Sequence, residues 1–364
     1  MALGKRNQES EERQGTEGTT ENAREVSDME AVPESASVNF VGEGRANVVF
    51  ELTGQLLRLP KDKSKAMSYA ELQAYWEQEV SPLFEHHELV QQRLIKLPRS
   101  PAFFARVNQQ LRELEDKGAR RRDFAGHLVS EGIQTGMLVE DMRPDASSSS
   151  PQGADSFTLH EIKPKWLHQS PRAPPGAEQC RNCAREVQRQ AKDGTRNAIF
   201  CPLNLVKLAD FPEDEGVARD VRRSVGLPDA EADNLLAWLR GSGLLRRLRA
   251  AQWENDHEFE VADVRRYSLA MTLRDCSLFL KISRRPGAGS GSGQGGAVVA
   301  KLADMDMKNF EIKRDYWERR EHDLHERGLY WKADRMSKAL TDCQLPFYRA
   351  SGRLPPEVGK YYPG

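Results

Sequence analysis

Two lysines at the end of a predicted strand could together bind a polyanion. They stand in the segment Glu161-Ile-Lys163-Pro-Lys165, which ends the alternating run at residues 157–162. Side chains two residues apart in an extended chain point to the same face, so Lys163 and Lys165 can meet one ligand. Clustered ammonium groups of this kind are suited to phosphate.

Three carboxylates frame a predicted hairpin farther along the chain. Asp275 precedes the predicted strand at residues 277–282, and Asp304 and Asp306 follow the return strand at residues 298–302. In protein kinases a catalytic aspartate, two strands and a metal-binding aspartate occur in this order. One carboxylate then orients or deprotonates the attacking hydroxyl while another holds Mg²⁺. The alternative is that these aspartates only cap turns.

A glycine-containing segment, Gly42-Glu-Gly-Arg-Ala-Asn47, lies between two predicted strands near the start of the chain. Glycines in such a place let backbone amides approach the phosphates of a nucleotide closely. A simple turn that needs glycine for a positive φ is the alternative interpretation.

A basic stripe follows the two lysines on a predicted helix. Its members recur at three- and four-residue spacing and are Arg181, Arg185, Arg189, Lys192 and Arg196. Residues at this spacing share one helical face. The stripe could serve the same polyanion as Lys163 and Lys165, or it could be an ordinary solvated surface.

The sequence Cys180-Arg-Asn-Cys183 has the spacing of a zinc half-site. Cys201 and His168 are further candidate ligands, but neither completes a familiar pattern. Zinc is therefore the less favoured interpretation. Hydrolase chemistry is disfavoured, because the sequence contains no Gly-x-Ser-x-Gly motif and no recognisable Cys/His pairing.

Composition restricts the class of protein. The 364 residues carry 54 basic and 55 acidic side chains, which is not the strong basic excess of a general nucleic-acid binder. Residues 1–37 contain no aromatic side chain and are expected to form a disordered acidic tail. Five cysteines and no apolar run near the roughly 20 residues that span a bilayer predict a soluble protein in the cytosol or nucleus.

The expected order of elements is an antiparallel meander followed by a mixed second half. Predicted strands lie at residues 38–41, 47–52, 55–59, 136–139, 157–162, 277–282 and 298–302. Predicted helices begin near Ser68, with a capping-box Glu71, and at Pro101, and two more are expected around residues 178–192 and 231–250. The first lobe is placed at 38–143, a Ser-rich linker at 144–156, and the second lobe at 157–364 with a flexible Gly/Ser insert at 284–297.

Taken together, six motifs resemble inositol-pentakisphosphate 2-kinases in their fungal form. They are Gly42-Glu-Gly-Arg-Ala-Asn47, Glu161-Ile-Lys-Pro-Lys165, Cys180-Arg-Asn-Cys183, Cys201-Pro-Leu-Asn-Leu205, Leu273-Arg-Asp-Cys-Ser277 and Asp304-Met-Asp-Met-Lys308. The resemblance implies an α+β inositol-phosphate kinase fold with two lobes, antiparallel sheets and flanking helices, distantly similar to protein kinases. It also implies ATP- and Mg²⁺-dependent phosphorylation of inositol 1,3,4,5,6-pentakisphosphate on the 2-hydroxyl, which gives phytate.

The resemblance also implies roles for individual residues. Those expected to contact the nucleotide are Gly42, Gly44, Asn47, Arg58, Glu140, Met142 and Lys163. Lys163 and Asp275 are implied to be catalytic, and Asp304 to hold Mg²⁺. Those expected to contact the inositide are Arg122, Lys163, Lys165, Arg189, Lys308 and Tyr316.

Two positions depart from the family pattern. Ile312 stands where a basic inositide ligand is expected, and the Arg240-Gly-Ser-Gly243 segment lacks an asparagine that plant members carry there. Several alternatives therefore stay open: a scaffold that binds inositol polyphosphates without turnover, a kinase for another inositol phosphate, and a zinc-assisted nucleic-acid module. The expected partner is an inositol polyphosphate, with neither direct nucleic-acid nor membrane binding, and a monomer in the nucleus and cytoplasm is expected.

Overall fold

The computed structural model describes residues 30–62, 67–143, 157–195, 199–256, 264–285, 297–331 and 342–353. Its contacts divide the chain into two compact units. The first unit contains the described residues up to Gln73 together with Gln91–Asp141, and the second contains Ala74–Val90 and everything from Met142 onward. The segment at residues 74–90 therefore belongs with the second unit although it precedes the last strands of the first.

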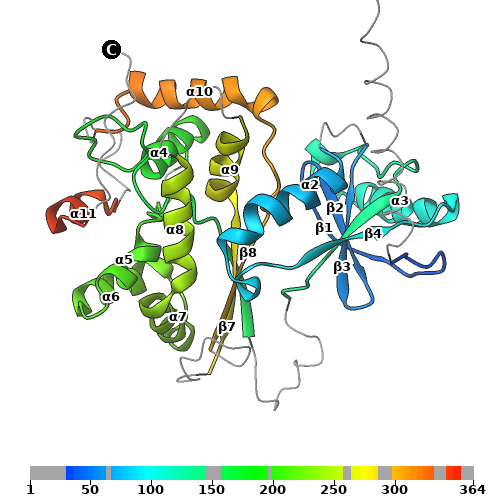
Figure 1. Ribbon diagram of the computed structural model, residues 1–364, viewed down its shortest axis with the longest axis horizontal. Helices are drawn as coiled ribbons and strands as arrows, with labels where there is room; N and C mark the ends of the chain where they lie inside the picture. Colours follow the sequence, from blue (N-terminus) through cyan, green and yellow to red (C-terminus); the bar gives the residue numbers. More distant parts are fainter. Residues whose placement is uncertain are drawn as a thin grey trace, which may run out of the picture. The chain divides into compact units, whose positions relative to one another are not determined.

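The first unit is built on a five-stranded sheet in which all neighbours are antiparallel (Figure 1). The order across the sheet is β1-β2-β3-β5-β4. The strands are β1 (Asn39–Glu43), β2 (Asn47–Leu52), β3 (Gln55–Pro60), β4 (Gln92–Lys96) and β5 (Thr135–Val139). The expected meander of the first three strands is confirmed, whereas β4 was not predicted from the sequence.

Helix α3 (Pro101–Asp116) packs against this sheet with the face that carries Phe103, Phe104, Val107 and Leu111. Pro101 stands at its first position, where the missing N–H costs nothing. Helix α2 (Tyr69–Tyr75) begins with the predicted capping box, because the N–H of Ser68 donates to Glu71 and the N–H of Glu71 donates to the Ser68 hydroxyl. Both predicted helix starts are confirmed.

Residues 30–37 belong to the described first unit, although the sequence suggested that the tail extends to residue 37. Val32 is buried, and its N–H donates to the carbonyl oxygen of Lys96 on the edge strand β4 at 2.9 Å. A short apolar stretch at the end of an acidic segment thus suffices to dock on a sheet edge.

The second unit contains an antiparallel three-stranded sheet in the order β6-β7-β8. Its strands are β6 (Phe157–Ile162), β7 (Ser277–Ser283) and β8 (Val298–Ala303). All three strands were predicted. In the register of the hairpin, Ser277 pairs with Ala303, so the residues just before β7 and just after β8 lie at the same end of the sheet.

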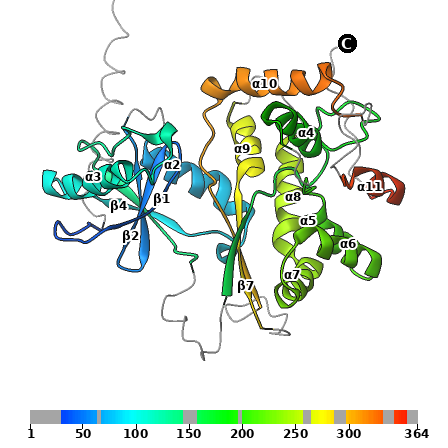
Figure 2. The ribbon, with the colours of Figure 1, turned by 180° about the vertical axis from the view of Figure 1, so that it is seen from behind.

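Helices make up most of the described second unit (Figures 1 and 2). They are α4 (Arg181–Asp193), α5 (Asn204–Asp210), α6 (Glu215–Val225), α7 (Asp229–Gly241), α8 (Gly243–Asp256), α9 (Val264–Asp275), α10 (Phe310–Glu326) and α11 (Leu345–Ser351). Short helical turns lie at Trp76–Val80, Ser81–Leu83 and His86–Glu88, and the first unit has one more at Arg122–Phe124. Helices α8 and α9 lie side by side in both views.

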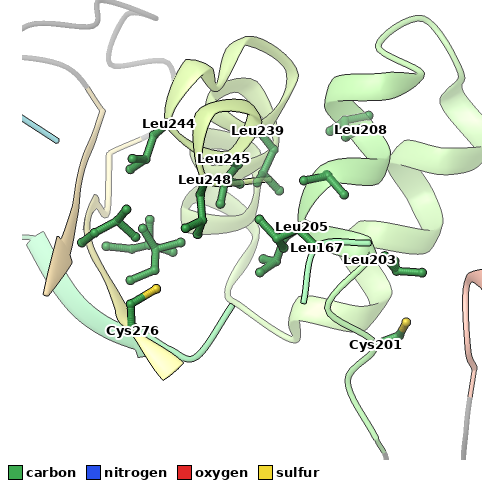
Figure 3. Packing of buried hydrophobic residues seen from close by; sticks show 14 of the residues in the cluster. Leu167, Cys201, Leu203, Leu205, Leu208, Leu239, Leu244, Leu245, Leu248 and Cys276 are labelled. Atoms are coloured by element: carbon green, nitrogen blue, oxygen red, sulfur yellow. The ribbon is translucent and has the colours of Figure 1, made fainter. Parts of the chain in front are cut away.

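Leucines from α5, α7 and α8 form the centre of the core of the second unit (Figure 3). The single helix predicted at residues 231–250 is instead two helices, α7 and α8, which is a correction. The break falls at Ser242, whose hydroxyl accepts from the N–H of Leu245 and so caps α8. The flanking Gly241 and Gly243 lower the helix propensity there, which allows the turn between them.

Three predicted segments lie wholly or partly outside the described residues: the acidic tail up to residue 29, the Ser-rich linker at 144–156, and residues 286–296 of the Gly/Ser insert. Among the helices of the described ranges, none has the length and apolar character that crossing a membrane requires.

Candidate active site

Five of the predicted site residues meet at the end of the three-stranded sheet and form what we call the lysine–aspartate cluster. Its members are Lys163, Lys165, Asp275, Asp304 and Lys308. Lys163 Nζ lies 2.7 Å from Asp304 Oδ2 and 3.1 Å from the backbone oxygen of Asp275. Lys165 Nζ lies 2.9 Å from Asp275 Oδ1, and Lys308 Nζ lies 3.5 Å from Asp275 Oδ2.

The fold explains why these residues meet. Strand β6 pairs with β7, so the segment after β6 that carries Lys163 and Lys165 lies at the end of the hairpin where Asp275 stands. Lys165 and Asp304 both have positive φ angles, of 53° and 56°. Side chains with a Cβ rarely adopt this conformation, and it concentrates at functional sites. Simple turn capping does not account for a cluster of three lysines around two aspartates.

Electrostatics keeps the cluster charged. Burial raises the pKa of Asp275, but the charges of Lys308, Lys165 and Lys163 outweigh burial and lower the pKa below its ordinary value. Burial lowers the pKa of Lys163, but Asp304 and Asp275 outweigh it and raise the pKa. The carboxylate of Asp275 is therefore ionised at neutral pH and can accept a hydrogen bond from a hydroxyl group.

The glycine segment of the first unit is anchored by the side chain between its two glycines. Glu43 accepts from Arg120 Nε and Nη2 at 2.9 and 2.8 Å, and Lys61 Nζ lies 2.6 Å away. All three side chains are buried. This ion-pair group was not predicted, because its partners come from three separate segments.

Gly42 and Gly44 themselves are not required by the backbone. Neither is among the glycines with a positive φ, and a Cβ added at either would meet no atom within 4 Å. The turn interpretation is therefore disfavoured. Small residues at these two positions leave the backbone open to close approach by a ligand.

Asn47 and Arg58 also meet in the first unit. In the amide orientation that satisfies both neighbours of Asn47, Arg58 Nη2 donates to its oxygen at 2.6 Å. Glu140 exchanges hydrogen bonds with the backbone of Gln91, and Met142 is buried in the second unit. Arg122 is exposed in the short helical turn at Arg122–Phe124.

The basic stripe on α4 does not form one solvated face. Arg181 is enclosed, with Nε 2.7 Å from Glu321 and its guanidinium 4.2 Å from the ring of Trp166. Arg189 is exposed and pairs with Glu186 and Asp193 of its own helix. Arg196 lies outside the described residues. The stripe is therefore a correction, since at least Arg181 has a structural role.

Arg185 is the α4 residue that faces Tyr316 on α10, and it was absent from the predicted site. Burial raises the pKa of Tyr316, but hydrogen bonding and charge from Arg320 and Arg185 outweigh it and lower the pKa. Ile312, one turn earlier, is exposed, and its N–H donates to the helix cap Asn309. The α10 surface thus presents a phenol between two guanidinium groups.

Four buried cysteines form a second cluster, contributed by Cys180, Cys183, Cys201 and Cys343. Their sulfur atoms lie within 4.8 Å of one another. Two backbone N–H groups point at the sulfurs, from Cys180 to Cys343 Sγ at 3.2 Å and from Gln344 to Cys201 Sγ at 3.4 Å. This four-cysteine cluster could hold a metal ion.

His168, which the sequence offered as a zinc ligand, is not part of that cluster. It is buried beside Trp253, with Nδ1 2.6 Å from the backbone oxygen of Gln169. Cys343 takes its place as the fourth thiol. No spacing rule pointed to Cys343, because it lies far along the chain from Cys201.

The comparisons agree with the site. The family model for inositol-pentakisphosphate 2-kinase matches residues 40–242 and 219–323, which is most of the chain. The chain belongs to the inositol-pentakisphosphate 2-kinase family. An inositol-pentakisphosphate 2-kinase of Yarrowia lipolytica is 28% identical over 309 residues, which cover 79% of this chain and 91% of the relative. One of Candida glabrata is 26% identical over 211 residues, covering 54% of this chain and 68% of the relative.

The region matched by the 2-kinase family model contains every residue of the lysine–aspartate cluster and three of the four clustered cysteines. Cys343 lies beyond it. A kinase of this family implies ATP as the phosphoryl donor and an inositol phosphate as the acceptor.

Proposed function

We propose that this 2-kinase transfers the γ-phosphoryl group of ATP to the 2-hydroxyl of inositol 1,3,4,5,6-pentakisphosphate at the lysine–aspartate cluster. The observation that carries the proposal is the convergence of three ammonium groups on Asp275 and Asp304. The acceptor and the nucleotide both bring many negative charges, so their reacting groups can be brought together only among several cationic donors.

Asp275 is proposed to orient the acceptor hydroxyl. Its lowered pKa makes it a weak base, but a loose phosphoryl-transfer transition state needs an aligned nucleophile more than early deprotonation. Lys165 and Lys308 hold the Asp275 carboxylate from two sides. The hydroxyl can therefore donate to a carboxylate whose position is already fixed.

Asp304 is proposed to hold Mg²⁺. A half-exposed carboxylate is a suitable hard oxygen ligand, and Mg²⁺ commonly binds one or two protein carboxylates together with substrate phosphates. Mg²⁺ would neutralise charge on the phosphates of ATP. Lys163, which donates to Asp304, fixes the orientation of that carboxylate and offers its ammonium group to the transferred phosphoryl group.

The first unit is proposed to bind ATP through the backbone of the Gly42–Asn47 loop and through Arg58. The open space over both glycines supports this assignment. Glu140 and Met142 would contact the adenine through backbone groups. On the inositide, Tyr316, Arg185 and Arg320 would bind one phosphate group, and Arg122 another. A kinase-like two-lobed arrangement, action as a monomer and residence in nucleus and cytoplasm are also proposed.

Identification of the product tests the function. Purified protein is incubated with Mg-ATP and each of several inositol phosphates, and the products are resolved by anion-exchange chromatography. We expect conversion of the 1,3,4,5,6-pentakisphosphate to the hexakisphosphate, faster than conversion of any other acceptor. Tight binding without turnover would instead support a scaffold, and preference for another acceptor would refute the proposed substrate.

We also propose that the four-cysteine cluster binds one structural zinc ion. In a tetrahedral site with Zn–S distances of about 2.3 Å, sulfur atoms are about 3.8 Å apart. Cys180 Sγ and Cys201 Sγ are 3.9 Å apart. The two N–H groups that point at sulfur would stabilise thiolate ligands. Zinc there would tie the segment before α11 to α4.

Metal analysis of the purified protein tests the zinc site, with Cys343→Ser as the variant and Cys276→Ser as the control. Cys276 is buried away from the cluster, and burial raises the pKa of its thiol to about 12. We expect one zinc per wild-type and Cys276→Ser chain and clearly less in Cys343→Ser. Equal zinc contents in all three proteins, or none, would refute the site.

A further inference from the structure

The amide of Gln252 connects the two backbone segments that carry Lys165 and Asp275. Gln252 lies in α8 and is fully buried. Its Nε2 donates to the carbonyl oxygen of Lys165 at 2.6 Å and to that of Leu273 at 3.0 Å. Its Oε1 accepts from the N–H of Leu167 at 2.9 Å. One side chain therefore joins residues 165–167 to the last turn of α9.

Both segments need such a partner. Lys165 has a φ of 53°, which is unfavourable for a residue with a Cβ, so its backbone must be held by its surroundings. Leu273 lies in the last turn of α9, where carbonyl groups lack a partner within the helix. The two protons of one NH₂ group satisfy both carbonyls at once. A carboxylate or an apolar side chain of similar length cannot do so.

The neighbouring Trp166 keeps this part of the chain folded independently of Gln252. Its Nε1 donates to Asp256 Oδ2 at 2.7 Å, and its ring lies 4.2 Å from the guanidinium of Arg181 and 4.4 Å from that of Arg274. Loss of the Gln252 amide should therefore release the peptide groups on either side of Trp166 without unpacking the indole.

We propose that Gln252 is a positioning residue that fixes the ammonium group of Lys165 relative to the carboxylate of Asp275. The inference rests on the roles proposed above for these two side chains, whose Nζ and Oδ1 atoms lie 2.9 Å apart. Gln252 contacts the backbone of this site and not its side chains. Its loss lowers kcat more than it raises KM, because Lys308 and Tyr316 still bind the inositide.

A matched amide elsewhere in the second unit provides the control. Asn234 on α7 is buried, and its Nδ2 donates to the carbonyl oxygens of Ser283 and Arg285, both at 2.8 Å. These carbonyls lie at the opposite end of β7 from Asp275. Gln252→Met and Asn234→Leu thus each deprive two backbone carbonyls of an amide donor, and only the first pair belongs to the site.

The experiment compares kcat and KM of both variants, scaled to the folded fraction. We expect Gln252→Met to lower kcat roughly 10- to 100-fold with KM changed less than about threefold, as for small misplacements of reacting groups. Asn234→Leu should keep kcat within about twofold. An equal loss of kcat in both variants, or no loss in Gln252→Met, would overturn the positioning role. An inactive wild-type protein would overturn the proposed function itself.

A double-mutant cycle with Lys165→Ala gives a readout that a merely structural role would not move. If Gln252 acts through Lys165, Gln252→Met should lower kcat less than about twofold further in that background. Full additivity would refute the inference. If Gln252→Met does not fold, Gln252→Asn replaces it, since the shorter amide can reach at most one of the two carbonyls.

Discussion

Replacement of Glu43 by alanine tests the anchoring of the proposed nucleotide loop. Glu43 stands between Gly42 and Gly44, and it is the carboxylate with which Lys61 pairs among the described residues. Without it, the buried ammonium of Lys61 keeps only the ring of Phe124, 3.8 Å away, as a compensating contact. The loop would lose its attachment to the chain below it.

The expected magnitude follows from the partners that remain. Removing one member of a buried ion pair costs about 3 to 5 kcal/mol. Arg120 keeps Glu115 at 3.0 Å and the carbonyl oxygen of His127 at 2.9 Å, so its charge stays compensated. We therefore expect Glu43→Ala to lower the free energy of unfolding of the first unit by about 3 kcal/mol, at the lower end of that range.

Hydrogen exchange of the first unit is the suitable assay. All six tryptophans of the chain lie at or after residue 76, in the second unit, so tryptophan fluorescence would not report on the first. We expect protection of peptides from β1 to β3 to fall about a hundredfold and KM for ATP to rise. Glu34→Ala, an exposed change in the same unit, is the control. A loss of protection below about threefold would refute the reasoning.

The effect of Glu43→Ala should also depend on pH. Burial raises the pKa of Glu43, but hydrogen bonds and charge from Arg120 and Lys61 outweigh it and lower the pKa below its ordinary 4.5. Stability from this group is therefore present above about pH 4.5 and is lost as the pH falls through the lowered pKa. The difference between wild type and variant should shrink below pH 4.5.

Two further predictions concern the second unit. Arg185→Ala should raise KM for the pentakisphosphate about tenfold, because it removes a guanidinium beside Tyr316, whereas Arg189→Ala should change it less than about twofold in the same initial-rate assay. Burial lowers the pKa of His168 to about 4. The unfolded chain then binds one more proton as the pH falls from about 6.5 to 4, so the wild type should lose about 2 kcal/mol between pH 7 and 5 that His168→Leu does not lose. Parallel urea-unfolding profiles for the two proteins would contradict this.

The sheets could be predicted from the sequence because local patterns encode them. Alternating or apolar runs bounded by glycines marked seven of the eight strands, and the order of Asp275, hairpin and Asp304 brought both carboxylates to one end of β7 and β8. The lysine–aspartate cluster follows from that register and from the position of Lys163 directly after β6.

Features that depend on distant segments could not be predicted. Helix α9 buries Ser268, Thr272 and Arg274 alongside its apolar residues, so it shows no amphipathic period. Cys343 joins Cys201 only through the fold of the C-terminal segment. Which arginine of α4 meets Tyr316 is likewise set by the packing of α10, and not by spacing within α4.

The most direct test of the central claim is the turnover and binding of Asp275→Asn. In this variant the side chain keeps its size but loses the charge proposed to orient the acceptor hydroxyl. We expect hexakisphosphate formation to fall at least about 100-fold while the Kd for the pentakisphosphate stays equal or decreases, because a negative charge has been removed from the site. Turnover within about threefold of wild type would contradict the assignment of the lysine–aspartate cluster as the active site.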